Sequence, residues 1–228
     1  MQSSTAAFFR QFIVKVHSRC DLACDHCYVY QHADQSWASQ PRMMSLDTAA
    51  RIGERVAEHA RRHALDSVRF VLHGGEPLLC PAGHLGQIIS TLRTAVADVA
   101  AADFRVHTNG VRLDEKYLSL FVQENVLVGV SLDGDRAGND LRRRYADGRT
   151  SHPQVLRALA LLRRPEYRNS YAGILCTIDL ANDPIRTYEA LAAEEPPNIG
   201  LLLPHGTWDA PPDGLAARAA AGPAAGIP

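Results

Sequence analysis

The sequence predicts an α/β protein in which strands and helices alternate through six strands. Short runs rich in β-branched and aromatic residues recur along the 228 residues, and segments with apolar residues at helical spacing separate them. This alternation favours a parallel sheet with right-handed crossovers, which is either a doubly wound sheet or part of a (β/α) barrel. In both folds the functional residues follow the carboxyl ends of the strands.

Six strands and five helices are expected, in alternating order. The predicted strands are residues 12–16, 68–72, 104–108, 126–132, 172–178 and 199–203. The predicted helices are residues 47–63, 84–101, 114–124, 152–163 and 183–193. Three of these helices begin with residues suited to an N-cap or a first turn. Ser45 and Asp47 can cap the first helix and Asp114 the third. Asp183 can cap the fifth, where Pro184 suits the first turn.

Residues 1–210 are expected to form a single domain, because the alternation of strands and helices runs through them. The remaining residues, 211–228, are rich in Ala, Gly and Pro and contain no convincing strand. We expect these residues to be a weakly ordered tail.

Composition excludes several classes of partner. The formal net charge of −1 gives no electrostatic reason to bind nucleic acid or an anionic membrane. No apolar run approaches membrane-spanning length, and the first residues lack the pattern of a signal peptide. The five cysteines are odd in number and clustered, which argues against a secreted disulfide framework. A reduced, cytoplasmic setting is therefore predicted.

Polar motifs, all but the first containing glycine, follow most of the predicted strands. These motifs are RCDLACDHCY (19–28), HGGEP (73–77), TNG (108–110), SLDGD (131–135) and LPHGTWD (203–209). Because the carboxyl ends of parallel strands meet at one edge of a sheet, the motifs are expected to lie together.

Three cysteines, Cys20, Cys24 and Cys27, lie within eight residues in a polar segment. Three closely spaced thiolates suit a soft metal centre, and a [4Fe–4S] cluster with one iron left open is the favoured interpretation. Structural zinc is the alternative, although it usually needs two separated pairs of ligands. The candidates for a fourth zinc ligand are His17, His26 and His32. The two isolated cysteines, Cys80 and Cys176, are predicted to be small core residues.

The spacing Cys20-x3-Cys24-x2-Cys27 after a first strand, followed by GGEP and TNG, resembles the radical S-adenosylmethionine (SAM) enzymes. The resemblance covers about residues 10 to 210. It implies a partial (β/α)6 TIM-like barrel, with Cys20, Cys24 and Cys27 as the ligands of a [4Fe–4S] cluster. In that family the open iron binds the amino and carboxylate groups of SAM, and an electron from the cluster cleaves SAM to methionine and a 5′-deoxyadenosyl radical.

The resemblance also implies contacts to SAM. Gly74, Gly75 and Glu76 would meet the methionyl ammonium, and Arg143, in the segment 139–151, would bind the carboxylate. His26 would lie near the adenine. Asn109 and Ser131 would contact the ribose or the substrate. Simpler interpretations stand beside these roles. The glycines suit a tight turn, Glu76 with Pro77 suits a helix start, and Arg143 suits a solvated basic face.

The motifs HGGEPLL, HTNG, GVSLDGD and LLLPHGTWDAPP most resemble the SPASM-type peptide maturases. These enzymes have a C-terminal SPASM domain that carries extra iron–sulfur clusters, and they include anaerobic sulfatase maturases and FxsB-type cyclophane-forming enzymes. The resemblance implies a ribosomal precursor peptide as substrate and an electron donor such as flavodoxin or ferredoxin. Since no cysteines follow Cys176, we expect the SPASM domain to be absent, with a separate SPASM-like partner as one route to activity. Three functions stay open: a peptide-modifying radical SAM enzyme, an inactive remnant or half of a split maturase, and a zinc-stabilised module.

Overall fold

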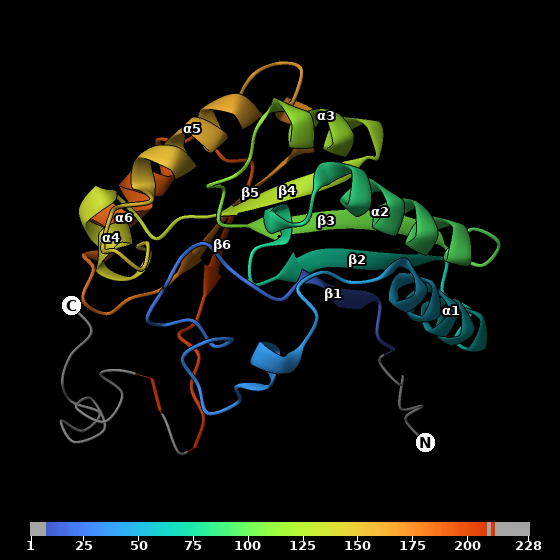
Figure 1. The fold of residues 1–228 in the computed structure, drawn as a ribbon. Helices are drawn as coiled ribbons and strands as arrows, with labels where there is room; N and C mark the ends of the chain where they lie inside the picture. The colour runs from blue at the N-terminus through green and yellow to red at the C-terminus, as the bar shows by residue number, and fades with distance from the viewer. Residues whose placement is uncertain (1–7, 209–210, 213–228) are drawn as a thin grey trace, which may run out of the picture.

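The protein forms one parallel sheet of six strands covered by helices (Figure 1). The computed structural model describes residues 8–208 and 211–212, so nearly all of the predicted tail at 211–228 lies outside the described residues. The strands are β1 (Gln11–His17), β2 (Ser67–Gly74), β3 (Ala101–Thr108), β4 (Val126–Ser131), β5 (Tyr171–Thr177) and β6 (Ile199–Leu202).

The strands lie in the order in which they occur in the sequence, and every neighbouring pair is parallel. A doubly wound sheet would reverse its strand order at a switch point. The sequential order therefore confirms the barrel alternative, and β1 and β6 remain unpaired with each other at the two edges of the sheet.

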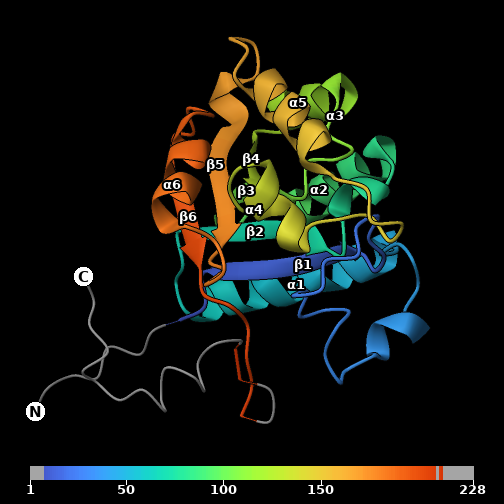
Figure 2. The ribbon, with the colours of Figure 1, turned by 90° about the vertical axis from the view of Figure 1, so that its left-hand side faces the viewer.

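The helices lie on one side of this sheet. They are α1 (Leu46–Arg62), α2 (Ala82–Val96), α3 (Glu115–Gln123), α4 (Arg136–Arg142), α5 (His152–Leu162) and α6 (Pro184–Ala192), with short 3-10 helices η1 (Ser36–Ser39), η2 (Pro77–Leu79) and η3 (Arg168–Ser170). Figure 2 shows α1, α2, α3, α5 and α6 in an arc around the strands. The segments that follow β1 and β6 lie on the opposite side, which is the concave side of a partial barrel (Figure 1).

Local capping explains where the helices begin. Ser45, Asp114 and Asp183 each accept a hydrogen bond from a backbone N–H in the first turn of α1, α3 and α6. Asp47 lies inside the first turn of α1 instead of capping it. The helix α4 was not predicted from the sequence. Its sequence RAGNDLR has a single leucine and therefore no apolar residues at helical spacing.

The hydrophobic core lies between the sheet and the helices. Phe70, Phe104 and Phe121 are fully buried there, and burial of each such ring contributes about 1.5–3 kcal/mol. Cys80 and Cys176 are buried in the same core, which confirms that they are small core residues.

No helix among residues 8–208 combines the length and the apolar character that a membrane span needs.

Candidate functional site

The segment that carries Cys20, Cys24 and Cys27 leaves the end of β1 and is held by backbone hydrogen bonds on two sides. On one side, the N–H groups of Gly75 and Glu76 donate to the carbonyls of His17 and Arg19, each at 2.9 Å. On the other side, the N–H of Ala23 donates to the carbonyl of Arg144 at 2.8 Å. We call residues 20–27 the cysteine loop. These bonds place it across the carboxyl ends of the strands.

A cleft of about 570 Å³ opens between the cysteine loop and the concave face of the sheet. It gathers every residue that the sequence singled out for the cluster or for SAM. The lining includes Cys20, Cys24, His26, Cys27, Gly74, Gly75, Glu76, Asn109, Ser131 and Arg143. A neighbouring cavity of about 660 Å³ shares Gly74 and Gly75 with this cleft, but none of the three cysteines lines it.

The donor set of the cysteine loop fits an iron–sulfur cluster. All three cysteines are free thiols. Burial raises the pKa of Cys20 to about 12 and that of Cys24 to about 11, so cluster assembly at neutral pH must release protons. The backbone N–H of Leu22 donates to the Cys20 sulfur at 3.4 Å, a contact that favours the thiolate.

The arrangement gives no support to a zinc site. Among the residues that the structure describes, no three His, Cys, Asp or Glu side chains converge closely enough to hold one ion. A cubane cluster makes a different demand, since each of its three cysteines binds a different iron. The loop offers three thiolates that line the same cleft.

The two glycines at the end of β2 are required by close contact with residues on either side of the cysteine loop. A Cβ at Gly74 would overlap the carbonyl oxygen of His17. A Cβ at Gly75 would overlap the Tyr30 hydroxyl and lie 2.5 Å from the carbonyl oxygen of Arg19. The glycines therefore allow the protein's own loop to approach β2, and their contact with SAM stays a prediction.

Gly75→Ala is expected to destabilise the protein by about 1–3 kcal/mol, because the added methyl forces the cysteine loop away from β2. Gly83 in α2 provides the matched control, since a Cβ there meets nothing within 4 Å. Gly83→Ala should be neutral or slightly stabilising. Urea denaturation of both variants measures the difference, and equal stability of the two would contradict the role given to Gly75.

Glu76 is fully buried and organises the floor of the cleft. Its carboxylate accepts hydrogen bonds from the N–H of Leu78 at 2.9 Å, the hydroxyl of Thr108 at 2.6 Å and the N–H of Asn109 at 2.8 Å. Burial raises the pKa of Glu76 to about 7, although these three donors favour the ionised form. The 3-10 helix η2 follows directly, so the simpler interpretation of Glu76 as a helix start is also correct.

Asn109 has a structural partner that the sequence did not reveal. Its side-chain N–H group donates to Asp21 of the cysteine loop at 2.9 Å, and its carbonyl oxygen accepts from the N–H of Val111 at 2.9 Å. Arg112 donates to the other oxygen of Asp21, also at 2.9 Å. The TNG motif thus anchors the cysteine loop, and a contact of Asn109 with SAM stays a prediction.

Arg143 follows α4 and lies buried against Asp133. Its Nε donates to the Asp133 carboxylate at 2.6 Å, and Asp133 also accepts from the N–H of Thr177 at 2.8 Å. Burial alone would lower the pKa of Arg143, but the Asp133 carboxylate beside it raises that pKa overall. Arg143 is therefore not part of a solvated basic face, and it is a fixed positive charge that lines the cleft.

The remaining two predicted residues lie in the same cleft with fewer contacts. His26 lies 3.9 Å from Asp133, and its Nδ1 is buried without a hydrogen-bond partner. Burial lowers the pKa of His26, so its ring is neutral at physiological pH. Ser131 ends β4 and lines the cleft. Both residues are available for a ligand, and their contact with SAM stays a prediction.

Two residues of the cleft, His73 and His107, were not predicted from the sequence to belong to the site. They lie on the concave face at the ends of β2 and β3, with ring centroids 6.2 Å apart. Burial lowers the pKa of His73, and burial together with His73 and Arg105 lowers the pKa of His107 to about 4. Their only signal in the sequence was their place just before GGEP and TNG.

The neutral His107 is expected to make stability depend on pH. Its pKa in the folded protein is lower than the ordinary value of 6.5, so the unfolded chain binds the proton more tightly. Stability should therefore fall as the pH falls from about 6.5 to about 4. His107→Gln should lose less stability over this range. Urea denaturation at several pH values measures both slopes, and identical slopes would show that His107 does not titrate in this way.

Comparisons with known proteins agree with this geometry. The family model described as the Radical SAM superfamily matches residues 14–189. The serine-type anaerobic sulfatase-maturating enzyme of Bacteroides thetaiotaomicron is 27% identical over 168 residues, which are 72% of this chain and 40% of that enzyme. The cysteine-type anaerobic sulfatase-maturating enzyme of Clostridium novyi is 26% identical over 147 residues, which are 64% of this chain and 38% of that enzyme. The chain thus spans about 40% of the length of these curated relatives.

Solved structures share the fold. Native anSMEcpe with bound AdoMet and Kp18Cys peptide superposes with a TM-score of 0.72 at 21% identity, over 86% of this chain and 51% of that chain. Coproporphyrinogen III oxidase from Escherichia coli gives a TM-score of 0.55 at 11% identity, over 88% of this chain and 45% of that chain. The likeness confirms a fold of the radical SAM type.

Proposed function

The chain belongs to the radical SAM superfamily, and on this premise we propose that it cleaves SAM reductively at a [4Fe–4S] cluster in order to modify a ribosomal peptide. The observation that carries the proposal is the single cleft that ten predicted residues line together. When bound, the cluster supplies the electron that splits SAM into methionine and a 5′-deoxyadenosyl radical, which abstracts hydrogen from the substrate.

The side chains of the cleft have distinct tasks in this proposal. Cys20, Cys24 and Cys27 hold the cluster, and the Asn109–Asp21 contact fixes their loop. Arg143 binds the carboxylate of the methionyl group, because a guanidinium that uses its Nε for Asp133 keeps its two terminal nitrogens for another anion.

Glu76 lies near the other charged end of SAM in this arrangement. Its carboxylate has room for a further donor, since three hydrogen bonds leave one of about four acceptor sites. An ammonium beside it would also favour its ionised form, against the burial that raises its pKa. The backbone around Gly74 and Gly75 would complete this end of the site.

The peptide substrate is inferred from the relatives. The two curated relatives are sulfatase-maturating enzymes, and the anSMEcpe structure has a bound peptide. On the concave face, the neutral His73 and His107 offer donors and acceptors suited to the uncharged groups of a peptide. Cross-linking or oxidation of such a peptide is the proposed outcome. The proposed partners are flavodoxin or ferredoxin as the electron donor and a separate SPASM-like protein.

Anaerobic reconstitution tests the proposal. We expect about four irons per chain, the content of one cubane cluster, and formation of 5′-deoxyadenosine on addition of SAM and dithionite. A co-expressed precursor peptide that loses two hydrogens would establish the peptide reaction. Four irons without 5′-deoxyadenosine would instead favour a remnant that binds SAM without cleaving it.

A further inference from the structure

A group of arginines surrounds Tyr145 on the outside of the cysteine loop. They come from three parts of the chain: the turn after β3, the segment between α4 and α5, and α5 itself. We call this set the Tyr145 surface, and it consists of Arg112, Arg144, Tyr145, Arg149 and Arg157. All four arginines are exposed, and none of them lines the cleft.

The arginines are close to the tyrosine. The guanidinium of Arg149 lies 5.1 Å from the centroid of the Tyr145 ring. Burial raises the pKa of the Tyr145 phenol, and the positive charges of Arg149, Arg112 and Arg157 act to lower it. Arginines from separate parts of the sequence therefore gather around Tyr145.

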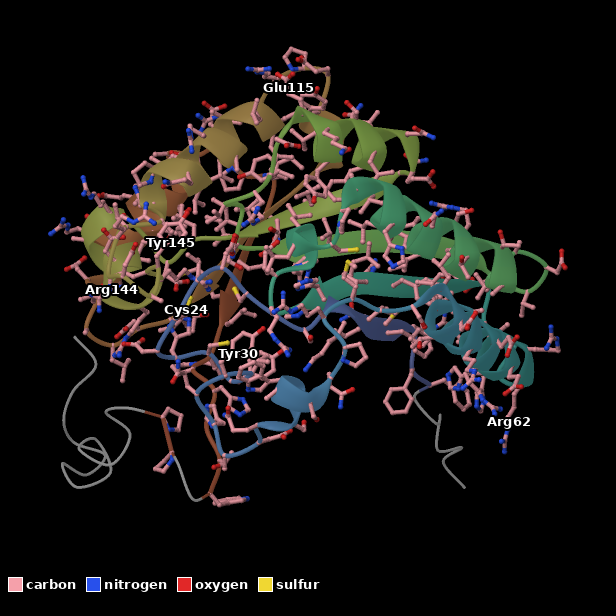
Figure 3. All side chains as sticks on the ribbon, viewed as in Figure 1. Cys24, Tyr30, Arg62, Glu115, Arg144 and Tyr145 are labelled. Atoms are coloured by element: carbon pink, nitrogen blue, oxygen red, sulfur yellow. The ribbon has the colours of Figure 1, made fainter. Side chains whose placement is uncertain are left out.

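This surface is attached directly to the cysteine loop. The carbonyl of Arg144 accepts the N–H of Ala23, and Arg112 donates to Asp21. Both contacts fall between Cys20 and Cys24 in the sequence. In Figure 3, Arg144 and Tyr145 lie beside Cys24, whereas Arg62 lies at the far end of the molecule.

The local charge differs from that of the chain as a whole. The chain has a formal net charge of −1. Asp21 pairs with Arg112 and Asp147 pairs with Arg149, and Asp140, which accepts a hydrogen bond from the neighbouring Thr150, pairs with Arg136. Arg144 and Arg157 leave a surplus of positive charge. A basic surface of this kind attracts an acidic partner over long distances.

We propose that the Tyr145 surface docks an acidic redox protein that delivers electrons to the cluster. The inference rests on the proposed function, because it needs a cluster in the cysteine loop. SAM and substrate approach that loop from the cleft, so a protein donor must approach from outside. With a cluster bound, a reduced flavin on the donor would lose one electron and the cluster would gain it, passing from the 2+ to the 1+ state. No covalent bond forms or breaks.

A bacterial flavodoxin is the probe that tests this inference. The variant Arg144→Glu/Arg157→Glu reverses two charges of the Tyr145 surface and leaves Arg112, which anchors Asp21, in place. The matched control is Arg51→Glu/Arg62→Glu, which makes the same change of charge at two exposed positions of α1. Fluorescence titration measures flavodoxin binding, and stopped-flow absorption measures cluster reduction by flavodoxin hydroquinone.

At low ionic strength we expect the Tyr145-surface variant to bind flavodoxin at least about ten-fold more weakly and to be reduced about ten-fold more slowly. The α1 control should stay close to wild type, and added salt should reduce the difference between the variants. Dithionite, which needs no docking surface, should reduce the cluster equally in all three proteins.

Wild-type flavodoxin affinity in the Tyr145-surface variant would overturn the inference, as would an equal loss in the α1 control. Loss of affinity for an acidic precursor peptide, with flavodoxin binding intact, would overturn it in favour of a peptide-docking role. Failure of dithionite to bleach the wild-type protein would count against the proposed function instead, and the binding titration would still decide whether flavodoxin docks here.

Discussion

Replacing Cys20, Cys24 and Cys27 together by alanine should reduce the iron content from about four per chain to nearly none. The three thiolates are the only ligands that the loop provides to the cluster in this proposal. Each single replacement should also remove or severely weaken the broad visible absorption, because a cubane with one missing cysteine exposes a second iron. Anaerobic reconstitution followed by iron quantitation and absorption spectroscopy measures the effect.

Two other cysteines provide the matched control. Cys80→Ala and Cys176→Ala make the same chemical change in the buried core. They should retain the cluster and lose a modest amount of stability, because each leaves a small cavity. A triple variant that keeps the chromophore, or a Cys80 variant that loses it, would remove the cysteine loop from the cluster site.

Arg143→Ala should have the second largest effect, acting on stability and on SAM binding together. The substitution leaves Asp133 buried without its ion pair, and breaking such a pair costs about 3–5 kcal/mol. It should also remove the proposed contact to the SAM carboxylate, which is expected to weaken binding by about ten- to a hundred-fold. Thermal unfolding and calorimetry with SAM measure the two effects.

A second substitution separates those effects. Arg143→Ala/Asp133→Asn removes the unpaired charge while keeping an oxygen that can accept the N–H of Thr177. Stability should recover in this double variant, and SAM affinity should not. If SAM affinity recovers together with stability, Arg143 acts only as the partner of Asp133 and makes no contact with SAM.

Much of the fold was predictable, because its signals are local and periodic. The alternation of strands and helices identified all six strands, and the caps at Ser45, Asp114 and Asp183 marked helix starts. The failure at α4 has the same origin, since a seven-residue helix with one leucine carries no periodic signal.

The sequence by itself determined which ligands the loop carries, because three thiols within eight residues come close together wherever a short polar segment turns back on itself. It also determined the cleft in outline, since parallel strands bring their carboxyl ends to one edge. The alternation of strands and helices alone left a doubly wound sheet and a partial barrel open, because the two differ only in strand order. The resemblance implied the barrel, and the strand order in the tertiary structure confirmed it. The tertiary structure alone paired Asn109 with Asp21, 88 residues away, and assembled the Tyr145 surface from three segments. Such contacts depend on how strands curve and pack, and spacing along the chain does not encode them.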